Sequence, residues 1–175
     1  MEWMMMPFRR YADFSGRSRR MEFWMWQVLQ IIVYVAFTVL MMLVGGGMMM
    51  TASDPSALAA AGGGILILGL VYLVYILIIF IPSLAVAVRR LHDTNRSGWW
   101  ILAPLVPYVL VFVGGGMAMS SPESPGAGGA IALIGMAGVA ILGLMLLVFY
   151  FLEGTKGPNR YGADPKGGAN DEVFA

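Results

Sequence analysis

Four long apolar runs constrain this chain more than any other feature. None of them contains Asp, Glu, Lys, Arg or His, and each is long enough to cross about 30 Å of hydrocarbon, which takes a helix of roughly 20 residues. Only 12% of the residues are charged, whereas about a quarter are charged in soluble domains. We therefore predict an all-α membrane protein with four transmembrane helices, at about residues 23–44, 65–88, 99–119 and 130–152.

Two of these runs leave room for another interpretation. In the third, Pro104, Pro107 and the glycines at 114–116 weaken the helix propensity, although its length and apolarity still favour a span. For the first, a cleaved signal peptide is the alternative, because a basic leader precedes it and residues 57–59 resemble a small-residue cleavage site. That run is about twice as long as the apolar core of a signal peptide, so we expect it to remain as a span.

The basic residues are confined to three of the segments outside the spans. All 11 Lys and Arg lie in the leader (1–22), the central turn (89–98) or the tail (153–175), and the two remaining loops hold none. Because Lys and Arg are enriched in cytoplasmic loops, we expect the N- and C-termini and the central turn to be cytoplasmic. The tryptophans that flank the spans agree, since aromatic rings favour the headgroup layer; they are Trp24, Trp26, Trp99 and Trp100.

The central turn reads RRLHDTNRSGWW from residue 89 to residue 100. Asn95 and Gly98 tolerate a left-handed backbone, and Asp93 and Ser97 can accept hydrogen bonds from nearby backbone N–H groups, so we predict a compact, ordered turn. His92 beside Asp93 is a candidate for general-base or metal chemistry. Neighbours in sequence rarely point at each other, however, so a structural or interfacial histidine is the preferred interpretation.

The leader and the tail carry the other polar motifs. In the leader, Arg19 and Arg20 would lie just outside the hydrocarbon, where anionic headgroups attract each basic side chain by about 1 kcal/mol. The tail, EGTKGPNRYGADP, lacks hydrophobic periodicity, but its Gly, Pro and Asn residues indicate tight turns. Such a segment is either disordered or folded against another surface. If it folds, we expect Arg160 and Tyr161 to dock it on the leader and the central turn.

Three ordered motifs, DFSGRSRRMEFW, RRLHDTNRSGWW and GTKGPNRYGADP, together resemble the bacterial domain of unknown function 805 family, the YhaH-like inner membrane proteins. The resemblance covers residues 13–165. Where that family often has Gly after the His-Asp-Thr run, this chain has Asn95, which can adopt the same left-handed backbone. The resemblance implies a small multi-pass protein of the bacterial inner (plasma) membrane, and it implies no established activity.

The motif positions that the resemblance carries over all lie on the predicted cytoplasmic side. We expect the three segments to pack into one cap, with Asp93 accepting hydrogen bonds from an arginine of the leader or the tail, because such charge-assisted pairs fix geometry. The candidate interaction surface consists of Arg17, Arg19, Arg20, Trp24, Arg89, Arg90, His92, Asp93, Ser97, Trp99, Asn159, Arg160 and Tyr161.

Glycines are numerous in and beside the apolar runs, notably at 45–47, 62–64, 114–116, 135, 138 and 143. Small residues let helix backbones approach closely. We therefore predict tight helix packing, chiefly in the half of the bundle away from the cap.

Composition also narrows the classes of function. The chain has no Cys and a single His, which excludes disulfides and thiolate metal sites and disfavours zinc, whose catalytic sites take three protein ligands. Ionisable residues inside spans are the usual indicator of transport, and their absence here argues against an ion-coupled carrier. We expect no catalytic residue, no metal and no cofactor.

The preferred hypothesis is a single domain over residues 1–175, a non-enzymatic four-helix protein whose cap binds a partner protein or anionic lipid headgroups. Membrane lipids are the expected partners, an unidentified protein or a second copy of the chain is a further option, and no nucleic acid is expected. The alternative is a transporter or small-molecule permeation component with a cytoplasmic pocket opened by Pro82, Pro104 and Pro107. A third hypothesis is a lipid-modifying enzyme with His92 and Asp93 at its centre.

Overall fold

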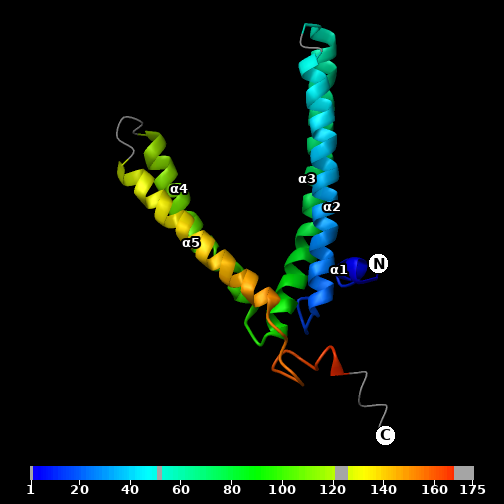
Figure 1. Cartoon of the computed structure of the whole chain (residues 1–175), viewed down its shortest axis with the longest axis vertical. Helices are drawn as coiled ribbons and strands as arrows, with labels where there is room; N and C mark the ends of the chain where they lie inside the picture. Colours follow the sequence, from blue (N-terminus) through cyan, green and yellow to red (C-terminus); the bar gives the residue numbers. More distant parts are fainter. Residues whose placement is uncertain (1, 51–52, 121–125, 168–175) are drawn as a thin grey trace. The chain divides into compact units, whose positions relative to one another are not determined.

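The computed structural model describes residues 2–50, 53–120 and 126–167. Over these residues it contains helices and no strand. Helices α2, α3 and α5, and the pair η1 and α4, are long and apolar enough to cross a membrane, which confirms an all-α membrane protein with four transmembrane helices. The elements are α1 (Glu2–Arg9), α2 (Arg20–Met50), α3 (Pro55–Asp93), the 3₁₀ helix η1 (Gly98–Leu102), α4 (Leu105–Ser120) and α5 (Gly126–Phe151) (Figure 1).

Some predicted segments extend past the described residues. Residues 51–52 and 121–125 of the two loops without basic residues, and residues 168–175 of the tail, lie outside them. The cytoplasmic placement of the termini stays a prediction.

The third span is irregular near its two prolines, as the sequence predicts. It begins as the 3₁₀ helix η1, passes Pro104, and continues as α4 from Leu105. Pro107 therefore lies in the first turn of α4, where backbone N–H groups have no partner inside the helix and a missing N–H costs little. The two prolines thus divide the span into two helical pieces without ending it.

The first two spans are longer than predicted. Helix α3 has 39 residues, which rise about 58 Å at 1.5 Å per residue, nearly twice the thickness of about 30 Å that a bilayer core requires. Only Pro82 interrupts its helix-forming sequence. The helix therefore continues past Val88, the predicted end of the span, through the polar residues up to Asp93.

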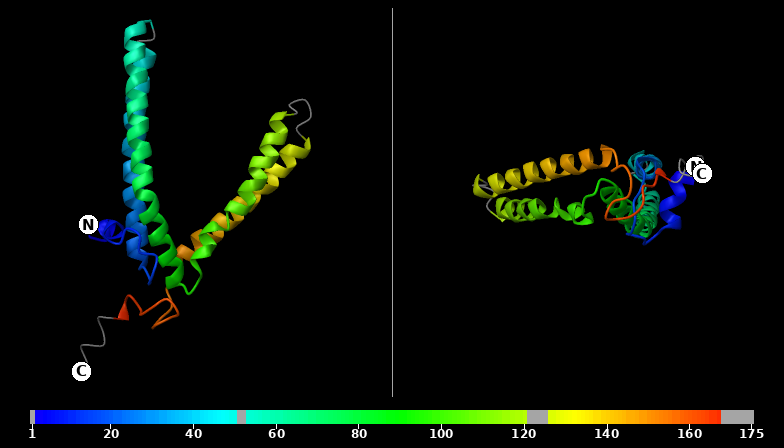
Figure 2. Two further views of the ribbon diagram at one scale, coloured as in Figure 1. Left: turned by 180° about the vertical axis from the view of Figure 1, so that it is seen from behind. Right: turned by 90° about the horizontal axis from the view of Figure 1, so that it is seen from below.

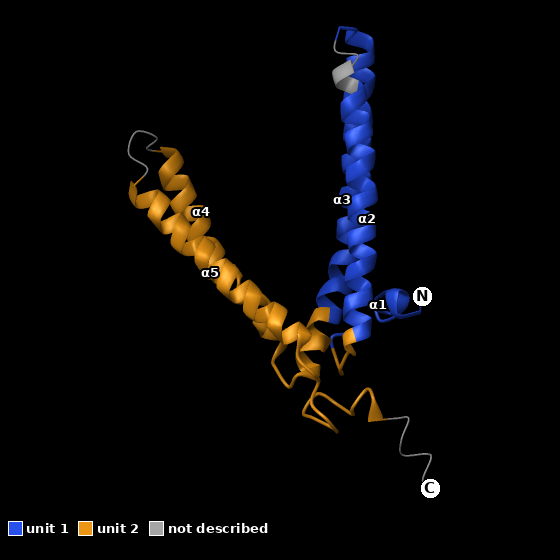
Figure 3. Cartoon of the chain, in the orientation of Figure 1, with its two compact units in different colours: residues 1–14, 21–86 blue, residues 15–20, 87–175 orange. Residues whose placement is uncertain are grey.

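The chain divides into two compact units, which we describe separately (Figure 3). Unit 1 comprises residues 1–14 and 21–86, and unit 2 comprises residues 15–20 and 87–175. The prediction of one domain over the whole chain stays a prediction.

Unit 1 is a hairpin of α2 and α3, with α1 packed on it. Figures 1 and 2 draw α2 and the unit 1 part of α3 side by side. Aromatic rings lie between them: Phe37 stacks on Tyr72 with the ring centroids 4.2 Å apart. The Tyr75 hydroxyl donates a hydrogen bond to Oε1 of Gln30, with 2.5 Å between the two oxygens. This pair of side chains is thus joined across the two helices, whereas Nε2 of Gln30 is buried without a hydrogen-bond partner among the described residues.

Sequence analysis missed α1, because eight residues that include a proline form too short a pattern to predict a helix. Two signals support it in retrospect: Glu2 lies in the first turn and Arg9 in the last. These are the ends where the helix dipole favours a negative and a positive charge respectively.

Unit 2 contains η1, α4 and α5, and its helices approach each other through glycines. A Cβ atom added at Gly128 would lie 2.5 Å from the backbone nitrogen of Ala118, and one at Gly135 would lie 2.7 Å from that of Val111. Both distances are too short for real atoms. The prediction that small residues allow close packing is therefore confirmed in α4 and α5 for Gly114, Gly135 and Gly138, whereas Gly115, Gly116 and Gly143 have no such contact among the described residues.

Within unit 1, the same prediction is not confirmed for the glycines of α2 or for Gly62 and Gly63. A Cβ atom added at any of Gly45, Gly46, Gly47 or these two would have no other heavy atom within 4 Å, apart from its neighbours in sequence and its own helix backbone. In this unit the observed contact between α2 and α3 includes the stacked rings of Phe37 and Tyr72.

Candidate functional site

Three polar segments that are far apart in the sequence come together in unit 2. They are residues 15–20 of the leader, residues 87–98 at the end of α3 and in the central turn, and residues 152–167 of the tail; we call them the polar cap. Hydrogen bonds join the leader to α3, the leader to the tail, and the tail to α3. The predicted packing of the three segments into one cap is therefore present.

Asp93, at the end of α3, is the centre of the polar cap. Arg17 of the leader donates from Nε to Oδ1 at 2.9 Å, and Arg90, one turn earlier in α3, donates to Oδ2 at 2.5 Å. The side chains of Arg17 and Arg90 are 1% and 0% exposed, and that of Asp93 is 7% exposed. The arginine contact that we predicted for Asp93 is thus present, and Arg17 supplies it from the leader.

The two buried guanidinium groups also hold backbone carbonyls of the tail. Arg17 donates to the carbonyl oxygens of Thr155 and Gly157, at 2.5 and 2.6 Å. Arg90 donates from Nε to the carbonyl of Tyr150 at 3.1 Å and from Nη2 to that of Leu152. The carbonyls at a helix C-terminus lack partners inside the helix and carry its negative dipole, so Arg90 is well placed to cap α5.

The tail in turn caps α3. The backbone nitrogen of Thr155 donates to the carbonyl oxygen of Asp93 at 2.9 Å, and Nδ2 of Asn159 donates to the carbonyl of His92 at 3.0 Å. Gly154 makes this approach feasible, because a Cβ atom there would overlap the Asp93 carboxylate. The tail is therefore folded, which decides between the two alternatives that its sequence leaves open.

The docking groups predicted for the tail are the ones observed. Arg160 donates to the carbonyl of Asn95 at 3.1 Å, and the ring of Tyr161 stacks on that of His92 with 3.8 Å between centroids. Nδ1 of His92 lies 3.2 Å from the carbonyl oxygen of Gly16. His92 thus joins the leader to the tail, whereas the neighbouring Asp93 faces Arg17 and Arg90, so the two side chains have separate partners.

The central turn is ordered as predicted, with one correction. Asn95 has a φ angle of 57°, which is the left-handed conformation expected of it. Gly98 does not adopt that conformation; it is needed instead for close packing, because a Cβ atom there would lie 2.7 Å from Cγ1 of Val88. Ser97 accepts a hydrogen bond from the backbone nitrogen of Trp99 and so caps η1.

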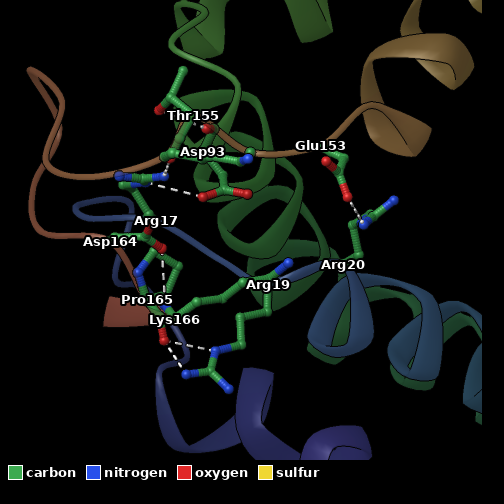
Figure 4. A pocket seen from close by; sticks show the side chains of 11 residues that line it. Arg17, Arg19, Arg20, Asp93, Glu153, Thr155, Asp164, Pro165 and Lys166 are labelled. Carbon is green, nitrogen blue, oxygen red and sulfur yellow. Dashed lines mark hydrogen bonds and ion pairs between the residues drawn. The ribbon is translucent and has the colours of Figure 1, made fainter. Parts of the chain in front are cut away.

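A pocket of about 310 Å³ opens in the polar cap between the leader and the tail (Figure 4). On its walls, Nη2 of Arg20 lies 2.8 Å from the carboxylate of Glu153, and Arg19 donates from Nε to the carbonyl of Pro165 at 2.7 Å. The lining residues are Arg17, Arg19, Arg20, Asp93, Glu153, Gly154, Thr155, Lys156, Asp164, Pro165 and Lys166.

Positive charge predominates in this pocket, with five basic against three acidic lining residues. Each carboxylate already has protein partners. Asp93 and Glu153 pair with Arg17 and Arg20, and Asp164 accepts backbone hydrogen bonds from Lys166 and from Gly157, which hold its pKa below its usual range. Among the described residues, the ammonium groups of Lys156 and Lys166 form no ion pair. The pocket therefore favours an anion.

The predicted interaction surface is divided by the structure into buried and accessible parts. Arg17, Arg89, Arg90 and Asp93 are buried, so these residues form the interior of the polar cap rather than its surface. Trp99 is 77% exposed. Trp24 belongs to unit 1, where its ring contacts that of Phe23 edge to face.

Sequence analysis missed four charged residues of the pocket, namely Glu153, Lys156, Asp164 and Lys166. The only available signal in the sequence was that the polar tail carries two lysines. The prolines at 82, 104 and 107, which suggested a pocket beside the spans, do not line this one.

Comparison with known proteins places the chain in a family. A family described as protein of unknown function DUF805 matches residues 11–163. The inner membrane protein YhaI of Escherichia coli (strain K12) is 34% identical over 174 residues, covering 97% of this chain and all of that protein. The inner membrane protein YhaH of the same organism is 31% identical over 166 residues, covering 95% of this chain and 98% of that protein.

No solved structure matches the chain significantly. The relatives are named inner membrane proteins, and this chain has four helices able to cross a membrane, so it is a multi-pass protein of the bacterial inner membrane. The match over most of its length shows that the chain belongs to the DUF805 family.

Proposed function

We propose that this protein is a non-enzymatic inner membrane protein whose polar cap binds the anionic headgroup of a membrane lipid. The observation that carries the proposal is the pocket of about 310 Å³, in which five basic residues face three carboxylates that already have partners. A phosphate group there would meet Lys156 and Lys166, whose ammonium groups point to no described carboxylate within ion-pair distance.

The position of the pocket along the chain favours a lipid. Arg20, which lines the pocket, is the first residue of α2, and Glu153 follows the last residue of α5 by two positions. Both therefore lie where apolar spans give way to polar sequence, which is the level of lipid headgroups. Basic pockets at that level attract anionic lipids by about 1 kcal/mol per Lys or Arg.

The size of the pocket favours a lipid headgroup over a protein partner. Pockets for small molecules measure about 300–1,000 Å³, and this one lies at the lower end of that range. A stable protein interface instead covers about 800 Å² on each partner. The non-enzymatic part of the proposal is supported by the separate partners of His92 and Asp93, because each serves to hold the polar cap together.

The test is lipid retention by the purified full chain. The double variant Lys156→Gln, Lys166→Gln removes two charges of the pocket, and Arg10→Gln, Arg96→Gln removes two basic charges outside it. Native mass spectrometry in a mild detergent, with phosphatidylglycerol or zwitterionic phosphatidylethanolamine added, measures the fraction of protein that carries lipid. We expect the lysine variant to bind phosphatidylglycerol about 30-fold more weakly, from about 1 kcal/mol for each charge, and the arginine variant to bind it like the native chain.

Two results would contradict the proposal. One is equal retention of phosphatidylglycerol by the lysine variant and the native chain. The other is equal binding of the two lipids by the native chain, because an anion site must distinguish them. If both results came with solute flux in proteoliposomes, the permeation alternative would replace headgroup binding.

A further inference from the structure

Helix α1 packs across the first two membrane helices rather than extending away from them. The ring of Phe8 contacts that of Trp26 edge to face, with 5.0 Å between centroids, and Pro7 is buried. Just after α1, the hydroxyl of Tyr11 donates to the carbonyl oxygen of Ile78 in α3 at 2.6 Å. Figures 1 and 2 draw α1 across the axis of α2. All of these residues belong to unit 1.

The contacts place α1 beside the membrane-crossing parts of both helices. Trp26 lies six residues into α2, about 9 Å from its start, and Ile78 lies fifteen residues before the end of α3, a rise of about 22 Å. Since α2 and α3 are long and apolar enough to cross the bilayer, the exposed apolar surface of the hairpin lies within the membrane.

The exposed apolar surface of α3 ends at the level of α1. Large apolar side chains are exposed along α3 from Leu66 to Phe80, and beyond Phe80 its apolar side chains are partly or fully buried. Residues 55–78 alone rise about 36 Å, which is sufficient for a hydrocarbon core of about 30 Å. The exposed apolar surface of α3 therefore ends near Ile78 and Phe80, and protein contacts cover the side chains that follow.

The residues of α1 and of the segment after it suit that boundary. Met5, Tyr11 and Phe14 are exposed apolar or aromatic side chains, whereas Glu2 and Arg9 are exposed charged ones. A segment with this mixture lies in the plane of the bilayer, between the headgroups and the acyl chains. Its charged side chains reach the headgroups while the apolar ones contact lipid.

We infer that α1 is an interfacial helix that lies in the surface of the bilayer, with lipid as its partner, beside the end of the exposed apolar surface of α3. Binding of α1 to the bilayer surface is independent of the headgroup pocket, because it rests on unit 1 alone.

The test is the depth of α1 in lipid nanodiscs. The chain has no Cys, so single variants can carry one nitroxide label each: Met5→Cys in α1, Leu70→Cys as the lipid-exposed reference and Ala163→Cys as the aqueous reference. The label is read by its collision rates with oxygen, which concentrates in lipid, and with a nickel complex, which stays in water. We expect the ratio of the two rates at position 5 to fall between those at 163 and 70.

Two results would overturn the inference. One is a ratio at position 5 equal to that at position 163, because α1 would then lie in water. The other is a single short distance between two position 5 labels on different chains, which would show that a second copy covers α1 instead of lipid. The ratio at position 5 should be unchanged when the chain also carries Lys156→Gln and Lys166→Gln. This control separates the inference about α1 from the proposed lipid pocket.

Discussion

The two units differ in how glycines contribute to the packing of their helices. In unit 2, glycines bring the backbones of α4 and α5 so close that a Cβ atom at Gly135 would lie 2.7 Å from the backbone nitrogen of Val111. In unit 1, an added Cβ atom at Gly69 would have no neighbour within 4 Å, and α2 and α3 meet instead through the stacked rings of Phe37 and Tyr72. Gly135 thus forms a backbone contact between α4 and α5, whereas Gly69 makes no contact between α2 and α3.

Unit 2 also contains the buried ion cluster of Asp93 with Arg17 and Arg90. Removing one partner of a buried ion pair strongly destabilises the fold, because it leaves an uncompensated buried charge. The difference between the units therefore indicates that unit 2 is sensitive to single changes at a few exact positions. Unit 1 depends on contacts that are spread along two helices and should tolerate single changes better.

The largest effect should follow from Asp93→Ala. Loss of the carboxylate leaves the buried guanidinium groups of Arg17 and Arg90 without their anion, which costs about 3–5 kcal/mol. The tail should detach, and trypsin should cleave it at Lys156 and Arg160 in membrane vesicles that expose this side. Asp13→Ala is the matched control, since its pair with Arg10 is partly exposed and such pairs contribute about 0–1 kcal/mol. Equal cleavage of the two variants would contradict the central role of Asp93.

The next effect should distinguish the glycines of the two units. Gly135→Leu forces α4 and α5 apart, because the new side chain would meet the backbone of Val111 and Pro107, and overpacking of this kind costs about 1–3 kcal/mol. Gly69→Leu adds the same side chain where there is space, so its unfolding temperature in detergent should match that of the native chain. Equal destabilisation by both variants would show that the comparison of glycine contacts is wrong.

A smaller effect should follow from Phe37→Ala in unit 1. An aromatic pair contributes about 0.5–1.5 kcal/mol beyond its buried area, so loss of the stack on Tyr72 should raise the rate of amide hydrogen exchange in α2 and α3 while α4 and α5 stay unchanged. Phe112→Ala is the control, because the side chain of Phe112 in unit 2 is 79% exposed. Faster exchange in α4 and α5 of the Phe37 variant would contradict the assignment of this contact to unit 1.

The smallest effect concerns the pH dependence of the tail. Backbone hydrogen bonds from Lys166 and then from Gly157 lower the pKa of Asp164, so the ionised carboxylate stabilises the turn. That contribution is complete above the pKa of the unfolded chain, about 3.9, and is lost as the pH falls through the lower pKa of the folded state. The amide NMR signal of Gly157 should therefore shift below about pH 4, and Asp164→Asn should abolish the shift. A shift that persists in the variant would assign it to another group.

Local sequence was sufficient to predict several features of the polar cap. The left-handed Asn95 follows from the small amide side chain that this conformation favours, and the docking of Arg160 and Tyr161 on the turn follows from a polar tail with no other surface to cover. The pocket could not be predicted in the same way from local sequence. Lys156 and Lys166 are ten residues apart in the tail, and only the fold of the tail brings both to the leader arginines.

By itself, the sequence determined that this is a four-span membrane protein with its polar motifs at the helix ends, because the length and apolarity of each run set its partition into lipid. Only the tertiary structure decided which basic residues are buried and which line the pocket. Arg17 and Arg19 are both arginines of the leader, yet one is enclosed with Asp93, 76 positions away, and the other reaches Pro165. Burial of a charge depends on partners that the fold supplies, and a local pattern holds no information about those partners.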